Sequence, residues 1–185
     1  MFAFVWGACV GWLSFEYRQE YAKALKSVGL AGYPAFAATV IAVSIAEECL
    51  CALFGCTLAV PTLWADLIFV VSIWLAWLST FYFYIALRYK FDYDEVLLVA
   101  AVAGLLFEIV TKPSALASPL IAFIAAGPVI MVCARITALP LGLVEWKGHR
   151  DGWMKYPIAF FVPFMASAVA LIPVFIFLTA IRAPL

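Results

Sequence analysis

Residues 34–60 read PAFAATVIAVSIAEECLCALFGCTLAV, and this stretch decides the fold. It is apolar over more than the roughly 20 residues that a helix needs to cross a bilayer. Its only charged side chains are the adjacent Glu47 and Glu48. A helix that is hydrophobic all round is buried in a large core or in a membrane. We therefore predict that residues 34–60 cross a membrane.

The composition of the whole chain indicates the same class of protein. Of its 185 residues, 68% are hydrophobic and 12% are charged, and the mean hydropathy is +1.12. Soluble domains are about 45–50% apolar and about 25% charged, so a water-soluble globular protein is excluded. Lys plus Arg and Asp plus Glu each number 11, which leaves no basic surface for nucleic acid. The composition predicts an all-α, polytopic membrane protein that lies in the lipid bilayer.

Five further apolar runs extend this prediction to a bundle of about six membrane-crossing helices. The runs are residues 2–15, 67–87, 96–111, 118–138 and 157–181, of which the first is short. No linker rich in Ser, Gly or charge separates them, so we expect residues 1–185 to form a single domain. Charged residues and tyrosines mix along residues 16–27, which predicts an amphipathic helix at the membrane interface.

The distribution of basic residues predicts the orientation. With six crossings, the segments 16–33, 88–95 and 146–156 lie on one side, and together they hold eight Lys and Arg residues. The other side holds only Lys112 and Arg182. Short cytoplasmic loops accumulate Lys and Arg. We therefore expect these three loops in the cytoplasm and both termini on the outer side.

Four ionisable side chains inside the apolar runs are candidates for a functional site. They are Glu47, Glu48, Glu108 and Arg135. The rise of 1.5 Å per residue along a helix puts these four side chains roughly 15–20 Å from the cytoplasmic ends of their helices, near the middle of the bilayer. An ionisable group there costs about 2.5–3.5 kcal/mol on insertion scales, so such groups pair or line a wet cavity. With a serine one turn before the second glutamate, the candidate ligand- or ion-binding residues are Glu47, Glu48, Glu108, Arg135 and Ser44.

The excess of acids in this set leaves two interpretations open. Three carboxyl groups accompany one guanidinium group, so at least one carboxyl is expected to hold a proton or a bound cation. A site of that kind suits transport or the binding of a cation or small ligand. Alternatively, Arg135 pairs with one glutamate, the other carboxyls are protonated, and the set only holds helices together.

An aromatic stripe in residues 67–87 is a further candidate. Trp74, Trp77 and Phe81 recur at helical spacing, and such a stripe can line a pocket for an apolar or cationic ligand. Packing in the core or against lipid accounts for the same spacing. We favour the packing interpretation.

Signatures of catalysis and of metal binding are absent from the sequence. The only histidine is His149, and the five cysteines have no ligand spacing for zinc or an iron–sulfur cluster. No P-loop, GxGxxG or GxSxG motif occurs. The acids at 92–95 and Asp66 open predicted helices, where helix capping explains them. The sequence thus predicts no metal site and no catalytic residue, and it names no cofactor.

Three functional hypotheses follow from these observations. The first is a transport or small-ligand- or cation-binding module built on a midplane carboxylate and arginine site. The second is a non-catalytic subunit of a larger membrane complex, whose partners are other membrane subunits or further copies of the chain. The third is a membrane-embedded enzyme that acts on a lipid or isoprenoid substrate, and it ranks last because the sequence supplies no nucleophile or metal.

Overall fold

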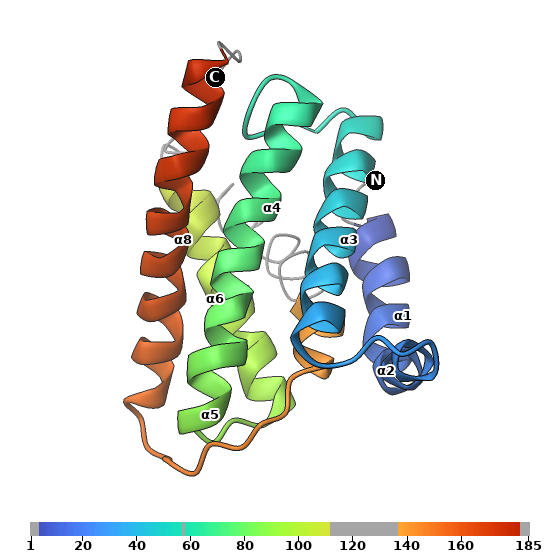
Figure 1. Ribbon diagram of the computed structural model, residues 1–185, viewed down its shortest axis with the longest axis vertical. Coiled ribbons are helices and arrows are strands. Elements are labelled where there is room, and N and C mark those ends of the chain that lie inside the picture. The colour runs from blue at the N-terminus through green and yellow to red at the C-terminus, as the bar shows by residue number, and fades with distance from the viewer. Residues whose placement is uncertain (1–3, 57, 112–136, 182–185) are drawn as a thin grey trace.

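The computed structural model describes residues 4–56, 58–111 and 137–181, and the regular elements in these ranges are helices (Figure 1). The elements are the π-helix η1 (Phe4–Val10), α1 (Gly11–Glu16), α2 (Arg18–Ser27), α3 (Gly32–Leu53), α4 (Leu63–Thr80), the π-helix η2 (Phe81–Ile85), α5 (Ala86–Arg88), α6 (Tyr93–Thr111), a short helix over residues 137–142, and α8 (Lys155–Ala180). The prediction of an all-α protein is confirmed for these residues.

Three of the described helices are long and apolar enough to cross a membrane. They are α3, the continuous helix Leu63–Arg88 formed by α4, η2 and α5, and α8. The second and third match the predicted runs 67–87 and 157–181 closely. The helix predicted over residues 34–60 corresponds to α3. The prediction that it continues to residue 60 is wrong, because α3 ends at Leu53. Membrane insertion through these three helices is what the described structure supports.

The other three predicted crossings stay predictions. Helix α6 covers the run 96–111, but its 19 residues begin with an acidic first turn of Asp94 and Glu95. The helical segment over residues 4–16 is shorter than a spanning helix requires. The run 118–138 lies outside the described residues up to residue 136.

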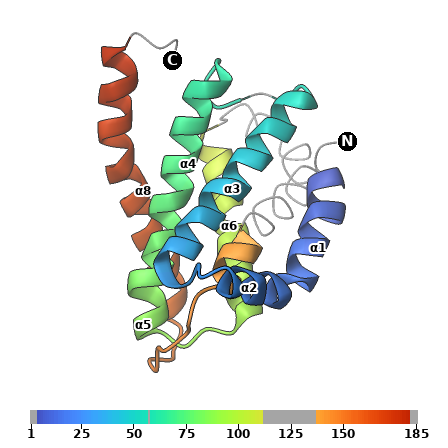
Figure 2. The ribbon, with the colours of Figure 1, turned by 45° about the vertical axis from the view of Figure 1, so that its right-hand side comes forward.

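Helix α4 packs against both α3 and α8, with α6 beside them in the bundle (Figures 1 and 2). The main core lies along η2 and the C-terminal half of α4, and aromatic side chains fill much of this core. Outside this core, the outward face of α8 exposes large apolar side chains, among them Phe161, Met165, Val169, Ile172 and Ile176. Such a face suits contact with lipid tails, which are as apolar as leucine.

The three basic loops lie at one end of the bundle, as predicted (Figure 1). Backbone bonds join two of them: Lys90 N–H donates to Arg150 O at 2.9 Å, and Arg150 N–H donates to Arg88 O at 3.0 Å. Gly148 permits this close approach, since a Cβ atom there would overlap the backbone of Tyr89. Most of the predicted amphipathic segment 16–27 is helical as α2, which lies across this end (Figure 2), and its place at a membrane interface stays a prediction. We call the end of the bundle that carries the three basic loops the loop end. That the loop end faces the cytoplasm stays a prediction.

Candidate functional site

Helix α3 buries three of the predicted site residues on its packed side. Ser44 is fully buried, and Glu47 and Glu48 are 8% and 9% exposed. Positions 44 and 48 are one turn apart and lie on the same face of the helix. Because α3 packs against α4, these polar groups lie at a helix–helix contact. Both glutamates are therefore buried within the protein, and their role as ligand- or ion-binding residues stays a prediction.

Asp66 of α4 completes the group, although the sequence analysis did not place it there. Its side chain is fully buried in the first turn of α4. The Val60 N–H donates to its Oδ1 at 2.8 Å, which ties the α3–α4 loop to α4. The Glu48 carboxyl lies near both the Glu47 and the Asp66 carboxyls. We refer to Glu47, Glu48 and Asp66 as the acidic cluster.

The acidic cluster is short of hydrogen-bond donors. Ionised carboxylates only accept hydrogen bonds. Among the described residues no donor reaches Asp66 Oδ2, and the buried Ser44 Oγ also has no partner there. Buried polar groups are normally paired, so each exception needs an explanation. A proton on one carboxyl, or a bound cation, would supply what Asp66 Oδ2 lacks.

The acidic cluster lies toward the α3–α4 loop. Glu48 is five residues before the end of α3, which is about 8 Å along the helix axis. Asp66 is three residues after the start of α4, about 5 Å along its axis. The cluster therefore lies at the end of the bundle opposite the loop end (Figure 1). Its depth in a bilayer stays a prediction.

Two cysteine thiols border the cluster, an arrangement that the sequence analysis did not predict. The chain leaves α3 through Gly55 at φ +71°, and Cys56 N–H donates to Cys51 O at 2.9 Å. This is the Schellman ending of a helix, which brings the residue after the glycine back over the last turn. The Cys51 thiol therefore lies near the Cys56 thiol on one side and near Glu47 and Glu48 on the other. Among the described residues, no three His, Cys, Asp or Glu side chains are arranged to hold a metal ion.

Two of the predicted site residues are not tested. Glu108 belongs to α6, but its side chain is among those that the structure does not describe. Arg135 lies outside the described residues altogether. Whether they join the acidic cluster therefore stays a prediction.

The aromatic stripe packs in the core. Trp77 and Phe81 are 5% and 0% exposed, and their ring centroids are 4.8 Å apart. Trp74 packs edge-on against Trp77 at 5.8 Å and borders the same core. This arrangement matches the packing interpretation that we favoured from the sequence.

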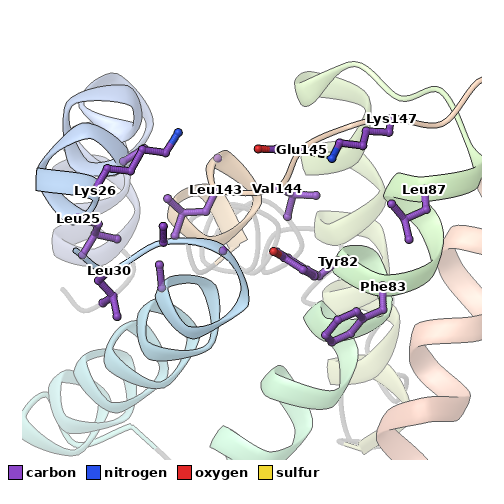
Figure 3. A pocket seen from close by; sticks show the side chains of 15 residues that line it. Leu25, Lys26, Leu30, Tyr82, Phe83, Leu87, Leu143, Val144, Glu145 and Lys147 are labelled. Carbon is purple, nitrogen blue, oxygen red and sulfur yellow. Dashed lines mark ion pairs between the residues drawn. The ribbon is translucent and has the colours of Figure 1, made fainter. Parts of the chain in front are cut away.

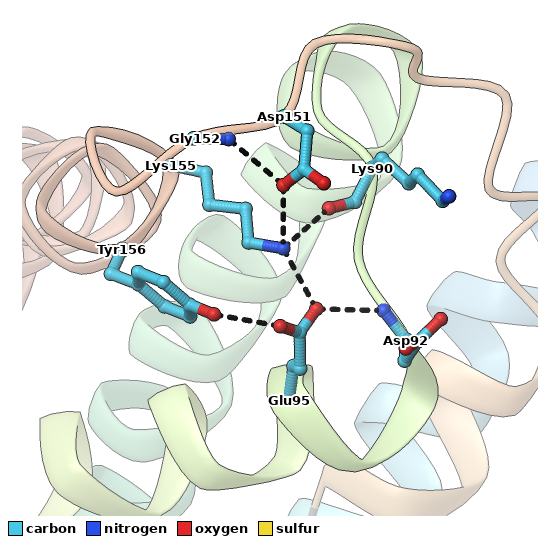
Figure 4. A network of polar contacts seen from close by, with 7 residues as sticks. All are labelled: Lys90, Asp92, Glu95, Asp151, Gly152, Lys155 and Tyr156. Atoms are coloured by element: carbon cyan, nitrogen blue, oxygen red, sulfur yellow. Dashed lines mark hydrogen bonds and ion pairs between the residues drawn. The ribbon is translucent and has the colours of Figure 1, made fainter.

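A second group of charges lies at the loop end and is fully paired (Figure 4). Lys155 Nζ donates to Glu95 Oε2 at 2.9 Å and to Lys90 O at 3.0 Å, and it lies 3.1 Å from Asp151 Oδ1. An ammonium group has three donors, so all of them are used. Glu95 also accepts from Asp92 N–H at 3.0 Å and from Tyr156 Oη–H at 2.7 Å. We call this group the Lys155 network.

The Lys155 network caps a helix and joins segments that are distant in the sequence. The bond from Asp92 N–H to Glu95 confirms helix capping for Glu95. These bonds hold the pKa of Glu95 down at about 2, first through the Tyr156 hydroxyl, then through Asp92 N–H and Lys155. Because every donor of Lys155 is used, we assign the network to structure rather than to ligand binding.

Asp66 was interpreted from the sequence as a helix-capping residue. In the structure Asp66 does lie in the first turn of α4, and its Oδ1 also accepts a hydrogen bond from the Val60 N–H of the preceding loop. One feature of the sequence could have predicted that Asp66 lies near Glu48. Helices joined by a short loop run antiparallel, so residues shortly before and shortly after the loop face each other. Glu48 and Asp66 stand in that relation.

Comparison of the chain with protein-family models, with curated proteins and with solved structures found no match.

Proposed function

We propose that this chain is an integral membrane protein that binds a proton, or a cation in its place, at the acidic cluster, as part of transport or ligand binding. The burial of Glu48 and Asp66 close to each other carries the proposal. Two buried carboxyls that lie close together repel each other unless a positive charge or a proton lies between them. Asp66 Oδ2, which no described donor reaches, is the acceptor that this proton or cation would satisfy.

The cost of burying the acidic cluster favours a binding role over a structural one. A carboxylate at a helix–helix contact is expensive to desolvate, and apolar side chains of similar volume hold helices together as well or better. A cluster kept only for packing would therefore gain from losing its charges. A cluster that exchanges a proton or cation needs them.

The place of the cluster supports exchange with water at the α3–α4 loop. Glu48 is about 8 Å from the end of α3 by the helical rise. Cys51, which borders the cluster on the side of this loop, is partly exposed. Leu53 at the last position of α3 is 80% exposed. A proton or small cation entering from this end would cross little packed protein.

The test uses the full chain in lipid vesicles and the variants Glu48→Gln and Asp66→Asn. Infrared difference spectroscopy across a pH step reports carboxyl groups that gain or lose a proton inside the protein. A pH-sensitive dye or an added cation inside the vesicles reports flux. We expect a carboxyl signal in the natural sequence that Glu48→Gln removes, together with any pH- or cation-dependent flux.

The matched control is Glu20→Gln, which removes one carboxyl from α2, a helix with no buried residues. This variant should keep both the infrared signal and the flux. If Glu48→Gln and Asp66→Asn leave both readouts at the level of the natural sequence, the proposed function is wrong.

A further inference from the structure

A cavity of about 310 Å³ opens at the loop end, far from the acidic cluster. It lies between α2, the start of α3, η2 and residues 142–147 (Figure 3). One side of its lining is charged and the other is apolar. The proposed function does not use this cavity.

The charged side consists of two lysines and one glutamate. Glu145 lies between Lys26 and Lys147 in Figure 3. Its Oε2 is 2.8 Å from Lys147 Nζ, and the charge of Lys26 also acts on it. One carboxylate therefore serves two ammonium groups, which leaves a net positive charge at the mouth of the cavity. The Tyr82 hydroxyl lies beside Gly32 and adds a neutral hydrogen-bond donor to the lining.

The start of α3 adds to this positive character. Ala31 and Gly32 line the cavity at the point where the helix begins. No side chain caps this end, and its first turn contains no acid. The N-terminus of a helix carries the positive end of its dipole. The lysines and the helix end thus act on the same space, with Glu145 as the acidic residue in the lining.

The apolar side continues onto the outer face of the bundle. Leu25 and Leu30 lie on one side of the cavity, and Phe83 and Leu87 lie on the other (Figure 3). Phe83 is 55% exposed and Leu87 is 50% exposed. Both belong to the helix Leu63–Arg88, which is apolar and long enough to span a membrane. The wall therefore leads from the charged mouth toward the surface that lipid tails would cover.

We propose that this cavity binds the phosphate-bearing headgroup of an anionic phospholipid. The phosphate lies inside the cavity, where Lys26, Lys147 and the start of α3 attract it, and the first carbons of the acyl chains lie along Phe83 and Leu87. Basic pockets beside membrane helices bind anionic lipid headgroups in this way. The amphipathic helix α2 forms one wall, which puts the cavity at the level where headgroups meet protein.

The test is native mass spectrometry of the full chain in detergent, with short-chain phosphatidylglycerol and phosphatidylcholine as probes. The natural sequence should bind phosphatidylglycerol more tightly. Each lysine near an anionic lipid surface adds about 1 kcal/mol, so the double variant Lys26→Gln with Lys147→Gln should reduce phosphatidylglycerol affinity by about 30-fold. Its affinity for phosphatidylcholine should stay nearly unchanged.

The charge-matched control is Lys23→Gln with Lys90→Gln, which removes two exposed lysines at the same end that do not line the cavity. A second variant, Leu30→Trp, fills the apolar side without changing charge. It should also lower phosphatidylglycerol affinity, whereas Val28→Trp should not, because Val28 is 76% exposed and outside the lining.

Three results would overturn the proposal. Equal loss of phosphatidylglycerol binding in the two double variants would mean that charge at this end matters but the cavity does not. Binding that none of the variants changes would place the lipid elsewhere. Glycerol phosphate that binds as tightly as phosphatidylglycerol would identify a free phosphate site, in which the apolar wall has no role.

Discussion

The two ends of this bundle use carboxylates in opposite ways. At the loop end, Glu95 receives donors from a lysine, a hydroxyl and a backbone N–H. At the other end, Glu48 lies near two further carboxyls, and Asp66 Oδ2 has no donor among the described residues. The first arrangement is complete in itself. The second is completed only by a proton, a cation or a group from outside the described residues.

This contrast separates stability from function within one small protein. Paired groups whose hydrogen bonds are all made hold a structure together. Groups that are buried without donors cost stability, and they persist where binding or exchange uses them. Removing a charge should therefore have opposite effects on stability at the two ends.

The largest effect is expected at the Lys155 network. Lys155→Met keeps an apolar side chain over the Phe91 ring but removes the donors to Glu95 and Asp151. Removing one partner of a buried pair costs about 3–5 kcal/mol. Because Asp151 is 64% exposed and Glu95 is 30% exposed, solvent screens part of this, and we expect a loss of about 2 kcal/mol. Thermal unfolding of the chain in detergent measures it.

The control for this prediction is Lys147→Met. Lys147 and Glu145 are also an ion pair, at 2.8 Å, but their side chains are 65% and 74% exposed. Loss of this ion pair in Lys147→Met should therefore leave the unfolding temperature unchanged. If the two methionine variants unfold at the same temperature, burial does not distinguish the two pairs.

The spanning helices could be predicted from the sequence, but one of their ends could not. Hydropathy located the helix Leu63–Arg88 and α8 to within a few residues. It failed at the end of α3 because residues 56–60 are apolar too, apart from Thr57. A backbone effect decides that end: Gly55 takes φ +71° and turns the chain back. Hydropathy alone carries no information about such a turn.

The candidate site was predictable only where it depends on a single helix. Burial of Glu47 and Glu48 follows from their position in an apolar run. The contact with Asp66 crosses a loop, and the ion pair of Lys155 with Glu95 joins residues 60 positions apart in the sequence. Contacts of this kind depend on how helices pack, which periodicity and composition do not determine.

The opposite sign is expected at the acidic cluster. Glu48→Gln removes one buried charge and introduces an amide that can donate to Asp66 Oδ2. Satisfying a buried acceptor and removing like-charge repulsion should stabilise the chain by about 1 kcal/mol. The same thermal unfolding experiment measures it, with Glu20→Gln as the exposed control. A clear destabilisation by Glu48→Gln would show that a positive group already pairs with this carboxylate and would remove the contrast between the two ends.

The last effect concerns acid. The hydrogen bonds to Glu95 lower its pKa from 4.5 to about 2. A carboxyl whose pKa is lower in the folded state stabilises it above its unfolded pKa. The contribution of Glu95 is therefore complete above pH 4.5 and is lost as the pH falls toward 2. The unfolding temperature of the natural sequence should drop in this window relative to its value at neutral pH.

The variant Glu95→Gln isolates this contribution, because it lacks the titrating group. It should start from a lower unfolding temperature at neutral pH and lose less of it on acidification, so that the two curves approach each other near pH 2. Glu145→Gln, at the exposed pair, should follow the natural sequence throughout. Parallel curves for Glu95→Gln and the natural sequence would mean that Glu95 keeps its ordinary pKa, and the bonds from Tyr156, Asp92 and Lys155 would then contribute no preference for its ionised form.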